Sequence, residues 1–282
     1  NRMKETVEGV TFIIANTDLQ DLTTANADVK IQLGQELTGG RGSGAKPEVG
    51  KKAAQESKKE IEDALQGAHM VFITCGEGGG TGTGAAPVIA EIAQNLGALT
   101  IAVVTKPFSF EGKSRMKNAQ IGIEELRKHV DSLIVVPNDN LETLIDKNTP
   151  VLQAFGEVDN VLRQSVQSIS DLINFPGDIN LDFSDITTTM KDSGTAVIGI
   201  GVGTGEDRAI QAAKQAVQSP LLEKSIVGAT KAIINITGGS NLTLYETKQA
   251  VKIIESYAQT DLNVFYGTII NKNIRGGIKN EK

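Results

Sequence analysis

The chain is poor in thiols, histidines and aromatic rings, and each shortage excludes a class of site. One cysteine, Cys75, cannot close an internal disulfide, and two histidines cannot build a zinc cluster, which indicates a reducing cytosol. Aromatic residues make up 4% of the chain, tryptophan is absent and the net charge is −6, which argues against nucleic-acid binding. We therefore expect neither thiol, zinc nor nucleic-acid chemistry.

Long apolar runs are also lacking. No stretch approaches the roughly 18 residues of a membrane span, and no signal peptide opens the chain, so we expect no direct membrane insertion. The 282 residues exceed a usual single domain, which predicts two domains.

Four apolar runs are continuous rather than alternating, which is typical of strands buried on both faces. Helical patterns separate them and predict a doubly wound, mostly parallel α/β sheet. The runs are Val10 to Ala15, Met70 to Thr74, Leu99 to Thr105 and Leu133 to Val136, and they end near Asn16, Gly76, Thr105 and Asn138. Ligands of such sheets bind beyond the carboxyl ends of the strands, so these four loops are expected to converge on one crevice.

One of these loops, residues 76–87, reads Gly-Glu-Gly-Gly-Gly-Thr-Gly-Thr-Gly-Ala-Ala-Pro. Glycines let the backbone approach an anion closely, and successive N–H groups with the following helix N-terminus supply positive charge. A plain tight turn needs only one or two glycines, so the loop predicts a phosphate site. Its expected ligands are Gly76, Gly78, Gly79, Gly80, Thr81, Gly82, Thr83 and Gly84.

The second half of the chain has a different pattern. A helix from Pro150 to about Ile173 is long enough to bridge two domains, and beyond Pro176 the apolar runs alternate with polar or glycine positions. We predict a nucleotide-binding domain at 1–149, a linking helix at 150–175 and a smaller α+β domain at 176–282. Glycines at 199, 201, 203 and 205 have a strict period of two. This favours a strand with one thin face, that is, one face without side chains, over a second nucleotide loop.

Five separated motifs resemble the FtsZ family of bacterial cell-division GTPases, relatives of tubulin, over nearly the whole chain. They are Gly78 to Gly84, Pro107 to Gly112, Pro137-Asn138-Asp139, Asp159 to Gln164 and Asn180 to Asp185. The resemblance also implies a first strand with a phosphate loop before Asn1, and a last strand and a tail after Lys282. We therefore expect a partial sequence that lacks the first and last strands.

The resemblance implies a GTP-binding, GTP-hydrolysing protein that forms head-to-tail homopolymers at the mid-cell division ring in the cytoplasm. Its cofactors would be GTP or GDP and Mg²⁺, with the metal held by the nucleotide phosphates and by no direct protein ligand. Division-ring proteins and membrane tethers would bind through the tail.

The resemblance also implies further nucleotide contacts. The segment Ser43-Gly44-Ala45 looks like the loop that senses the terminal phosphate. The remaining positions are Asn16, Pro107, Glu111 and Arg115, and Asn138 at the base. An ordinary surface ion pair is the alternative for Glu111 and Arg115.

Spacing on the linking helix predicts base recognition. Phe155 and Asp159 are four residues apart, so a ring that covers a purine lies beside a carboxylate that accepts the N1 and N2 hydrogens of guanine. The alternatives are core packing for Phe155 and a solvated charge for Asp159.

Asp182, Asp185 and Asn180 match the acidic loop of the family and are the predicted hydrolytic residues. One chain is not expected to bring them to its own nucleotide, so a neighbouring subunit would lend them in trans to orient water. Head-to-tail contacts that do not close build filaments, which couples assembly to hydrolysis. Taken alone, the stretch is an acidic surface loop.

Two departures from the family pattern concern charge near the phosphates: Lys46 stands where asparagine is usual, and Glu77 where methionine is common. Lys46 either faces the phosphates or is solvated. Glu77 would repel phosphates unless Mg²⁺ intervenes or its side chain points away, and we expect the latter.

Two other functions remain open. The chain as written could be a non-hydrolysing fragment that caps filaments. It could also be an NADP-linked oxidoreductase, since residues 80–85 satisfy a loose G-x-G-x-x-A pattern, although Lys106 stands where an acidic ribose ligand is usual.

Overall fold

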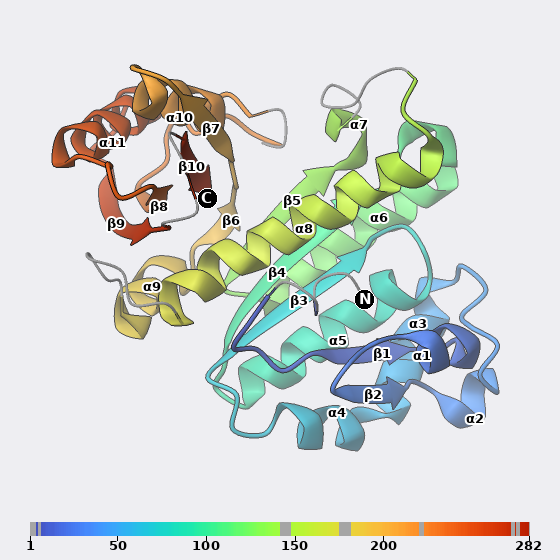
Figure 1. Ribbon diagram of the computed structural model, residues 1–282. Helices are drawn as coiled ribbons and strands as arrows, with labels where there is room; N and C mark the ends of the chain where they lie inside the picture. The colour runs from blue at the N-terminus through green and yellow to red at the C-terminus, as the bar shows by residue number, and fades with distance from the viewer. Residues whose placement is uncertain are drawn as a thin grey trace. The chain divides into compact units, whose positions relative to one another are not determined.

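The computed structural model describes residues 4, 7–141, 148–174, 182–219, 223–271, 274 and 277–281, so Asn180 lies outside the described residues. The chain forms two compact units (Figure 1). The first comprises Asn1–Arg163 and Met190–Ala196, and the second comprises Gln164–Thr189 and Val197–Lys282. Met190–Ala196 thus pack with the first unit, although the predicted C-terminal domain included them.

The first unit contains parallel strands in two sheets, which confirms the predicted α/β class. β1 (Ile13–Asn16) pairs with β2 (Val29–Gln32). The second sheet has the order β3 (Met70–Gly76), β4 (Leu99–Lys106), β5 (Ser132–Pro137) and β6 (Gly194–Ala196). Nearly every residue of β4 and β5 is buried, because the sheet is covered on both faces; this is why their sequences are continuously apolar.

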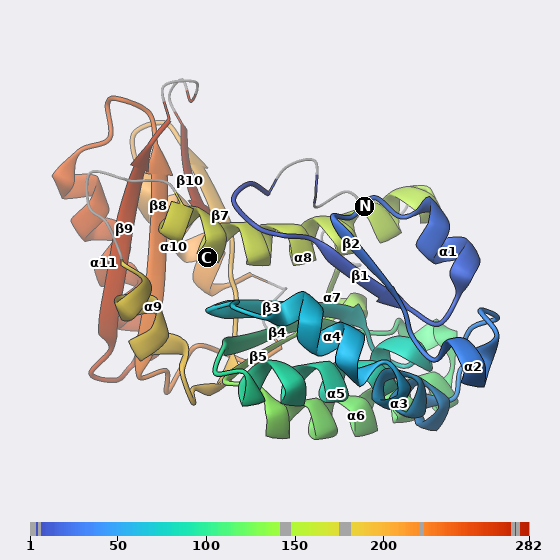
Figure 2. The ribbon, with the colours of Figure 1, turned by 90° about the horizontal axis from the view of Figure 1, so that it is seen from below.

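Helices cover both faces of the β3–β5 sheet. Figure 2 shows α5 and α6 on one face and, on the other, the first part of α8, which belongs to this unit. The helices are α1 (Leu19–Thr24), α2 (Gln35–Thr38), α3 (Pro47–Glu56), α4 (Lys58–Leu65), α5 (Thr81–Asn95), α6 (Lys113–Leu126), α7 (Asn138–Leu141) and α8 (Val151–Asn174). The long α8 agrees with the predicted linking helix. None of the described helices combines the length and hydrophobicity that a membrane span requires.

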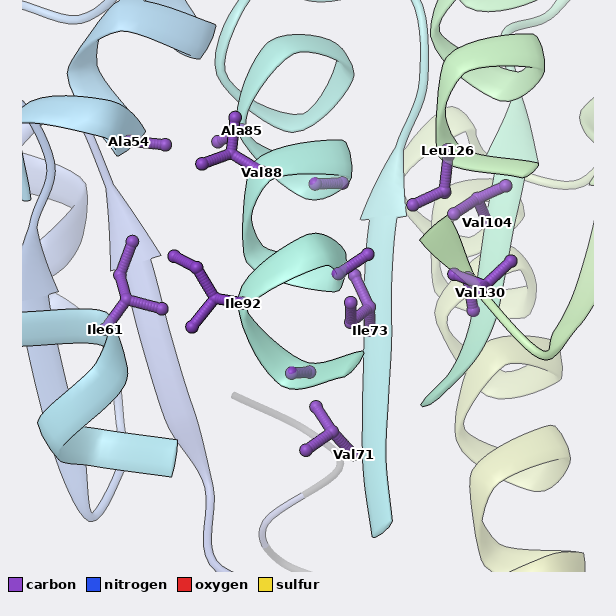
Figure 3. Packing of buried hydrophobic residues seen from close by; sticks show 14 of the residues in the cluster. Ala54, Ile61, Val71, Ile73, Ala85, Val88, Ile92, Val104, Leu126 and Val130 are labelled. Carbon is purple, nitrogen blue, oxygen red and sulfur yellow. The ribbon is translucent and has the colours of Figure 1, made fainter. Parts of the chain in front are cut away.

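α5 lies at the centre of the first hydrophobic core. Figure 3 shows Ile92 between Ile61 of α4 and Ile73 of β3, and Ala85 beside Ala54 of α3. Burying an isoleucine side chain stabilises the fold by roughly 1.5–3 kcal/mol. The helix that carries the glycine loop at its N-terminus is therefore fixed by packing on both sides.

The second unit has a mixed sheet, as an α+β domain should. Its order is β7-β10-β8-β9; β8 and β9 are parallel, and β10 is antiparallel to β7 and β8. The elements are α9 (Phe183–Met190), β7 (Gly201–Thr204), α10 (Arg208–Val217), β8 (Lys231–Gly238), α11 (Leu244–Ala258), β9 (Asn263–Ile270) and β10 (Gly277–Glu281). Only the last residue of α9, Met190, falls in the first unit.

A buried ion pair joins the two large helices of this unit. Arg208 is 6% exposed and donates from Nε to Oε1 of Glu246 over 2.6 Å. The hydrogen bond from Arg208 is the main reason that the pKa of Glu246 is lowered to about 2. Glu246 also accepts from Thr243, the N-cap of α11, so one carboxylate joins the start of α10 to the start of α11.

The alternating glycines of the second unit have a structural role. A Cβ at Gly199, Gly201 or Gly203 would overlap a backbone carbonyl oxygen of α10, from Ala216, Ala212 and Arg208 respectively. Gly201 and Gly203 of β7 therefore lie directly against the helix backbone, as predicted for these two. Gly199 precedes β7, and Gly205 follows it with a φ of 81° and nothing within 4 Å of its Cβ position.

We expect Gly201→Ala to lower the free energy of unfolding by about 1–3 kcal/mol, because the added methyl group must displace α10. Urea denaturation measures this change. Gly79→Ala is the matched control, since nothing lies within 4 Å of its Cβ position and its φ is not positive. Equal effects of the two substitutions would contradict the close strand–helix contact.

Candidate functional site

The carboxyl ends of β3, β4 and β5 are in register. Gly76 lies beside Thr105, and Thr105 lies beside Val136. The backbone N–H of Glu77 donates to the carbonyl of Thr105 over 2.9 Å, which holds the start of the glycine loop against β4. Three of the four predicted loops therefore leave the sheet at one edge.

A cluster of three hydroxyls brings in two more loops. Thr81 Oγ1, at the first residue of α5, lies 2.6 Å from Thr17 Oγ1 and 3.1 Å from Ser43 Oγ. Thr17 is fully buried after β1, and Ser43 precedes α3. The side chain of Asn16 accepts from the N–H of Asp18 and shapes the same turn. The loops of Asn16, Ser43 and the glycine run thus meet, as predicted.

Sequence reasoning missed Thr17 as a site residue. Its signal was available, because it directly follows Asn16 at the end of a predicted strand. Gly44 and Ala45 are exposed beside the hydroxyl cluster, and Ala45 has a φ of 58°, an unusual value for a residue with a side chain. The segment is held in a conformation that its sequence does not favour, which is common where a loop is shaped for a ligand.

Packing accounts for several glycines of the loop. A Cβ at Gly80 would overlap Ser43 Oγ, and one at Gly84 would overlap the carbonyl oxygen of Pro47. A Cβ at Gly82 would lie 2.8 Å from the carbonyl oxygen of Gly76. Only Gly79 is open on its Cβ side. The glycines are therefore needed to seat the loop against α3 and β3, apart from any role in approaching phosphate.

The loop after β4 connects the glycine run to α7. Gly78 has a φ of 103° and lies against Pro107 and Arg115. A Cβ at Gly78 would be 2.8 Å from Cγ of Arg115. Further along, the N–H of Ser109 donates to Asp139 Oδ1 over 2.8 Å. The predicted residues Pro107 and Arg115 therefore lie beside the glycine loop.

Glu111 and Arg115 form the surface ion pair that was the alternative interpretation. Arg115 Nε lies 3.0 Å from Glu111 Oε2, and the other carboxylate oxygen accepts from the N–H of Phe108. Half of the Arg115 side chain stays exposed, so the pair does not prevent contact with a ligand.

Aromatic rings connect the loop after β4 to α8. The Phe108 ring stacks on Phe110 with centroids 5.0 Å apart and meets Phe155 edge-on at 5.4 Å. Phe155 is 41% exposed, and Asp159 one helical turn later is also exposed. Phe155 is thus partly exposed and is not a fully packed core residue.

Asn138 has an unusual environment. It is 5% exposed, and its Oδ1 has no hydrogen-bond partner. A buried acceptor without a donor costs roughly 1–3 kcal/mol, so this atom at the edge of the loop cluster is a candidate acceptor for a ligand group.

Glu77 points into the protein and not toward the open side of the loop. It is 2% exposed; Cys75 donates from Sγ to its Oε1 over 3.3 Å, and Oε2 has no partner. Burial raises the pKa of Glu77 to about 7, against smaller lowering contributions from Cys75 and Thr83. Burial likewise raises the pKa of the Cys75 thiol well above its usual value. This pair is therefore uncharged over much of the acidic pH range.

Asp182 and Asp185 belong to the second unit and cap α9 reciprocally. The N–H of Asp185 donates to Asp182 Oδ1 over 2.8 Å, and the N–H of Asp182 donates to Asp185 Oδ2 over 3.1 Å. This is the geometry of a capping box. Each carboxylate uses one oxygen in the cap, and its second oxygen forms no hydrogen bond with the described residues.

Two family profiles match the chain. The GTPase domain of the tubulin/FtsZ family matches residues 3–146, and the C-terminal domain of the FtsZ family matches residues 194–281. The first match lies in the first unit, and the second lies almost entirely in the second unit.

Solved structures agree with these matches. An empty FtsZ dimer from M. jannaschii is 44% identical with a TM-score of 0.92, covering 99% of this chain and 82% of that one. A tryptophan-to-tyrosine mutant of M. jannaschii FtsZ is 45% identical with a TM-score of 0.93, covering 99% and 84%. GDP-bound CetZ1 from Haloferax volcanii, at 22% identity and a TM-score of 0.80 over 95% of this chain and 83% of that one, shares the fold.

The stability of the protein should depend on pH through Glu77. Its pKa is raised from 4.5 in the unfolded chain to about 7. The stability gained from the bound proton is therefore fully present below pH 4.5 and is lost as pH rises through about 7. We expect the free energy of unfolding to fall by about 2–3 kcal/mol between pH 5 and pH 8, relative to Glu77→Gln. Urea denaturation at both pH values measures it, and parallel pH profiles of the two proteins would contradict a buried, titrating Glu77.

Proposed function

Because the chain belongs to the tubulin/FtsZ family, we propose that it binds GTP at the loop cluster of its first unit and hydrolyses it within a filament. The main support for this proposal is the continuous series of contacts that joins the predicted nucleotide loops within the first unit. Thr17, Ser43 and Thr81 meet through hydroxyls, Pro107 lies against Gly78, and Asp139 holds the segment after β4.

The phosphates would bind at the N-terminus of α5. This helix has 15 residues, and its first-turn amides and dipole favour an anion. Gly79 leaves open space, and the segment from Ser43 to Ala45 would contact the terminal phosphate. The lysine after that segment, Lys46, is exposed and could add a cation.

Mg²⁺ would be held chiefly by the phosphates. In the described part of the chain, no three histidine, cysteine or acidic side chains are grouped as metal ligands. The hydroxyls of Thr17, Ser43 and Thr81 are hard oxygen donors of the kind Mg²⁺ accepts beside phosphate oxygens and water. When bound, the ion neutralises charge on the phosphates.

Guanine would be recognised between β5 and α8. Asn138 Oδ1 is a buried acceptor in need of a donor, and the Asp159 carboxylate is an acceptor for the paired N1 and N2 hydrogens. The partly exposed side chain of Phe155 would cover the ring. Adenine offers no such pair of donors, which would give preference for guanine.

Hydrolysis would be completed in trans. A second oxygen on both Asp182 and Asp185 is available to accept hydrogen bonds from an attacking water, and Asn180 would assist. The water oxygen forms a bond to the terminal phosphorus while a carboxylate takes one of its protons, the bond from that phosphorus to the β-phosphate oxygen breaks, and GDP and phosphate leave. The FtsZ of M. jannaschii was solved as a dimer, which supports self-association of this chain.

We infer the cellular location and the further partners of the filament from the family. We place the filament in the cytoplasm at the mid-cell division ring, with division-ring proteins and membrane tethers as further partners. The capping of filaments by a non-hydrolysing chain is an outcome of the experiments below, and family membership leaves the NADP-linked interpretation without support.

We expect Asn138→Ala to weaken GTP binding by about 5- to 150-fold, because a 1–3 kcal/mol contact to the base is lost. Stability should change little, since Oδ1 has no partner within the protein. Asn235→Ala is the matched control: Asn235 is also buried with an unpartnered Oδ1, but it belongs to the second unit. Equal GTP affinities of wild type and Asn138→Ala, measured by fluorescence titration, would reject the base contact.

The trans site is tested by mixing two inactive proteins. The double variant Asp182→Asn, Asp185→Asn keeps the cap, because amide oxygens still accept, but it lacks the acids and should lose about 10²–10⁴-fold in rate. Gly79→Leu fills the open side of the loop and should block phosphate binding. A 1:1 mixture should recover up to about a quarter of the wild-type rate by random pairing.

Phosphate release measures this recovery. A mixture that assembles but stays inactive would contradict completion in trans, as would hydrolysis by wild type whose rate per subunit does not change on dilution. A wild type that binds GTP without hydrolysing it and shortens filaments of an intact relative would indicate the capping function.

A further inference from the structure

Glu77 is a carboxyl group buried inside a loop that is built for an anion. Its neighbours in sequence, Gly76 and Gly78, belong to the proposed phosphate site, and its side chain lies inward with 2% exposure. Oε1 accepts a hydrogen bond from the thiol of Cys75, whereas Oε2 has no hydrogen-bond partner. One oxygen of this carboxyl group is thus buried without a hydrogen-bond partner.

A second observation indicates that the neutral acid fits this position. Oε2 of Glu77 and the carbonyl oxygen of Thr83 both border the Cβ position of Gly122 in α6. Pro87 stands four residues after Thr83 in α5 and has no N–H, so it donates no helical hydrogen bond to that carbonyl. An unpartnered carboxylate oxygen therefore lies closely packed against α6, and a proton on Oε2 removes a charge that has no partner there.

Among the described residues, no cation contributes to the pKa of Glu77. Besides burial, the groups that affect the pKa of Glu77 are the thiol of Cys75 on β3 and the hydroxyl of Thr83 on α5. The charged side chains on the surrounding elements do not affect it. They are Arg115 of α6, which pairs with Glu111; Lys51 of α3, 3.9 Å from Glu125 of α6; and Lys106 at the end of β4.

We propose that Glu77 is a proton-binding site through which nucleotide binding is coupled to proton uptake. The inference rests on the proposed function, because it requires phosphates on the loop that contains Glu77. A bound di- or triphosphate opposes the carboxylate form, so binding draws one proton from water onto Oε2. No bond other than this O–H is formed, and the loop backbone keeps its arrangement.

The direction of the effect follows from linkage. The free protein holds the proton below about pH 7 and loses it above, and bound phosphate moves this transition to higher pH. Affinity should therefore be highest at acidic pH, fall as pH rises above 7, and level off once the bound form also loses its proton. Each unit by which phosphate raises the pKa of Glu77 gives a tenfold fall in affinity.

Calorimetric titration with GDP tests the coupling, because GDP is not hydrolysed. Titrations at pH 7.5 in buffers of different ionisation enthalpy give the number of protons taken up. We expect wild type to take up a larger fraction of a proton than Glu77→Gln or Glu77→Met, and its affinity to fall more steeply with pH. Glu60→Gln makes the same change at an exposed position of α4 and should behave as wild type.

A direct measurement avoids dependence on how the variants fold. The ¹³C shift of the Glu77 carboxyl in labelled wild type reports its pKa, which should rise when GDP is added. Binding of GDP with an unchanged Glu77 pKa, or with equal proton uptake by wild type and folded Glu77→Gln, would overturn the coupling while the proposed function stands. Failure of wild type to bind GDP at any pH would instead overturn the proposed function, and the coupling with it.

Discussion

The backbones of α3 and α5 touch without a side chain between them, and the whole loop cluster depends on that contact. A Cβ at Gly84 would overlap the carbonyl oxygen of Pro47, and a Cβ at Gly50 would overlap that of Gly80. The approach brings the segment before α3 within reach of the first residue of α5, so that the hydroxyls of Ser43 and Thr81 meet. Larger residues at these glycines would separate the two helices and disperse the loops that we propose for phosphate.

Sequence reasoning predicted the long central strands and the linking helix, because burial on both faces leaves continuous apolar runs. It did not identify β2 and β6, which have four and three residues and no distinctive pattern. β6 joins the first unit through tertiary contacts: the N–H of Gly194 donates to the carbonyl of Asp131, whose carboxylate accepts from Thr100 over 2.8 Å. Such pairings between distant segments leave no local signal, which is why the boundary near 190–196 could not be read from the sequence.

The same limitation applies within the site. The glycine run was read as a phosphate loop, yet Gly80, Gly82 and Gly84 are each required by neighbouring atoms of the protein. Asp182 and Asp185 were read as catalytic, yet they also cap a helix. A residue type that suits packing or capping can equally suit a ligand, so the sequence shows that such positions are constrained but does not separate the two causes. Mutations that keep one role while removing the other are needed to separate them.

Glu77 connects the stability of the fold to the chemistry of the site. Its carboxylate is unfavourable in the core because burial removes water and no cation replaces it. The same negative charge would be unfavourable beneath a loop that binds phosphates, as we propose for this one. Binding of one proton to the carboxyl group removes both costs. Folding and the proposed nucleotide binding therefore favour the same protonation state. A methionine, common at this position in the family, would satisfy the core at every pH, whereas a glutamate makes both properties depend on the acidity of the surroundings.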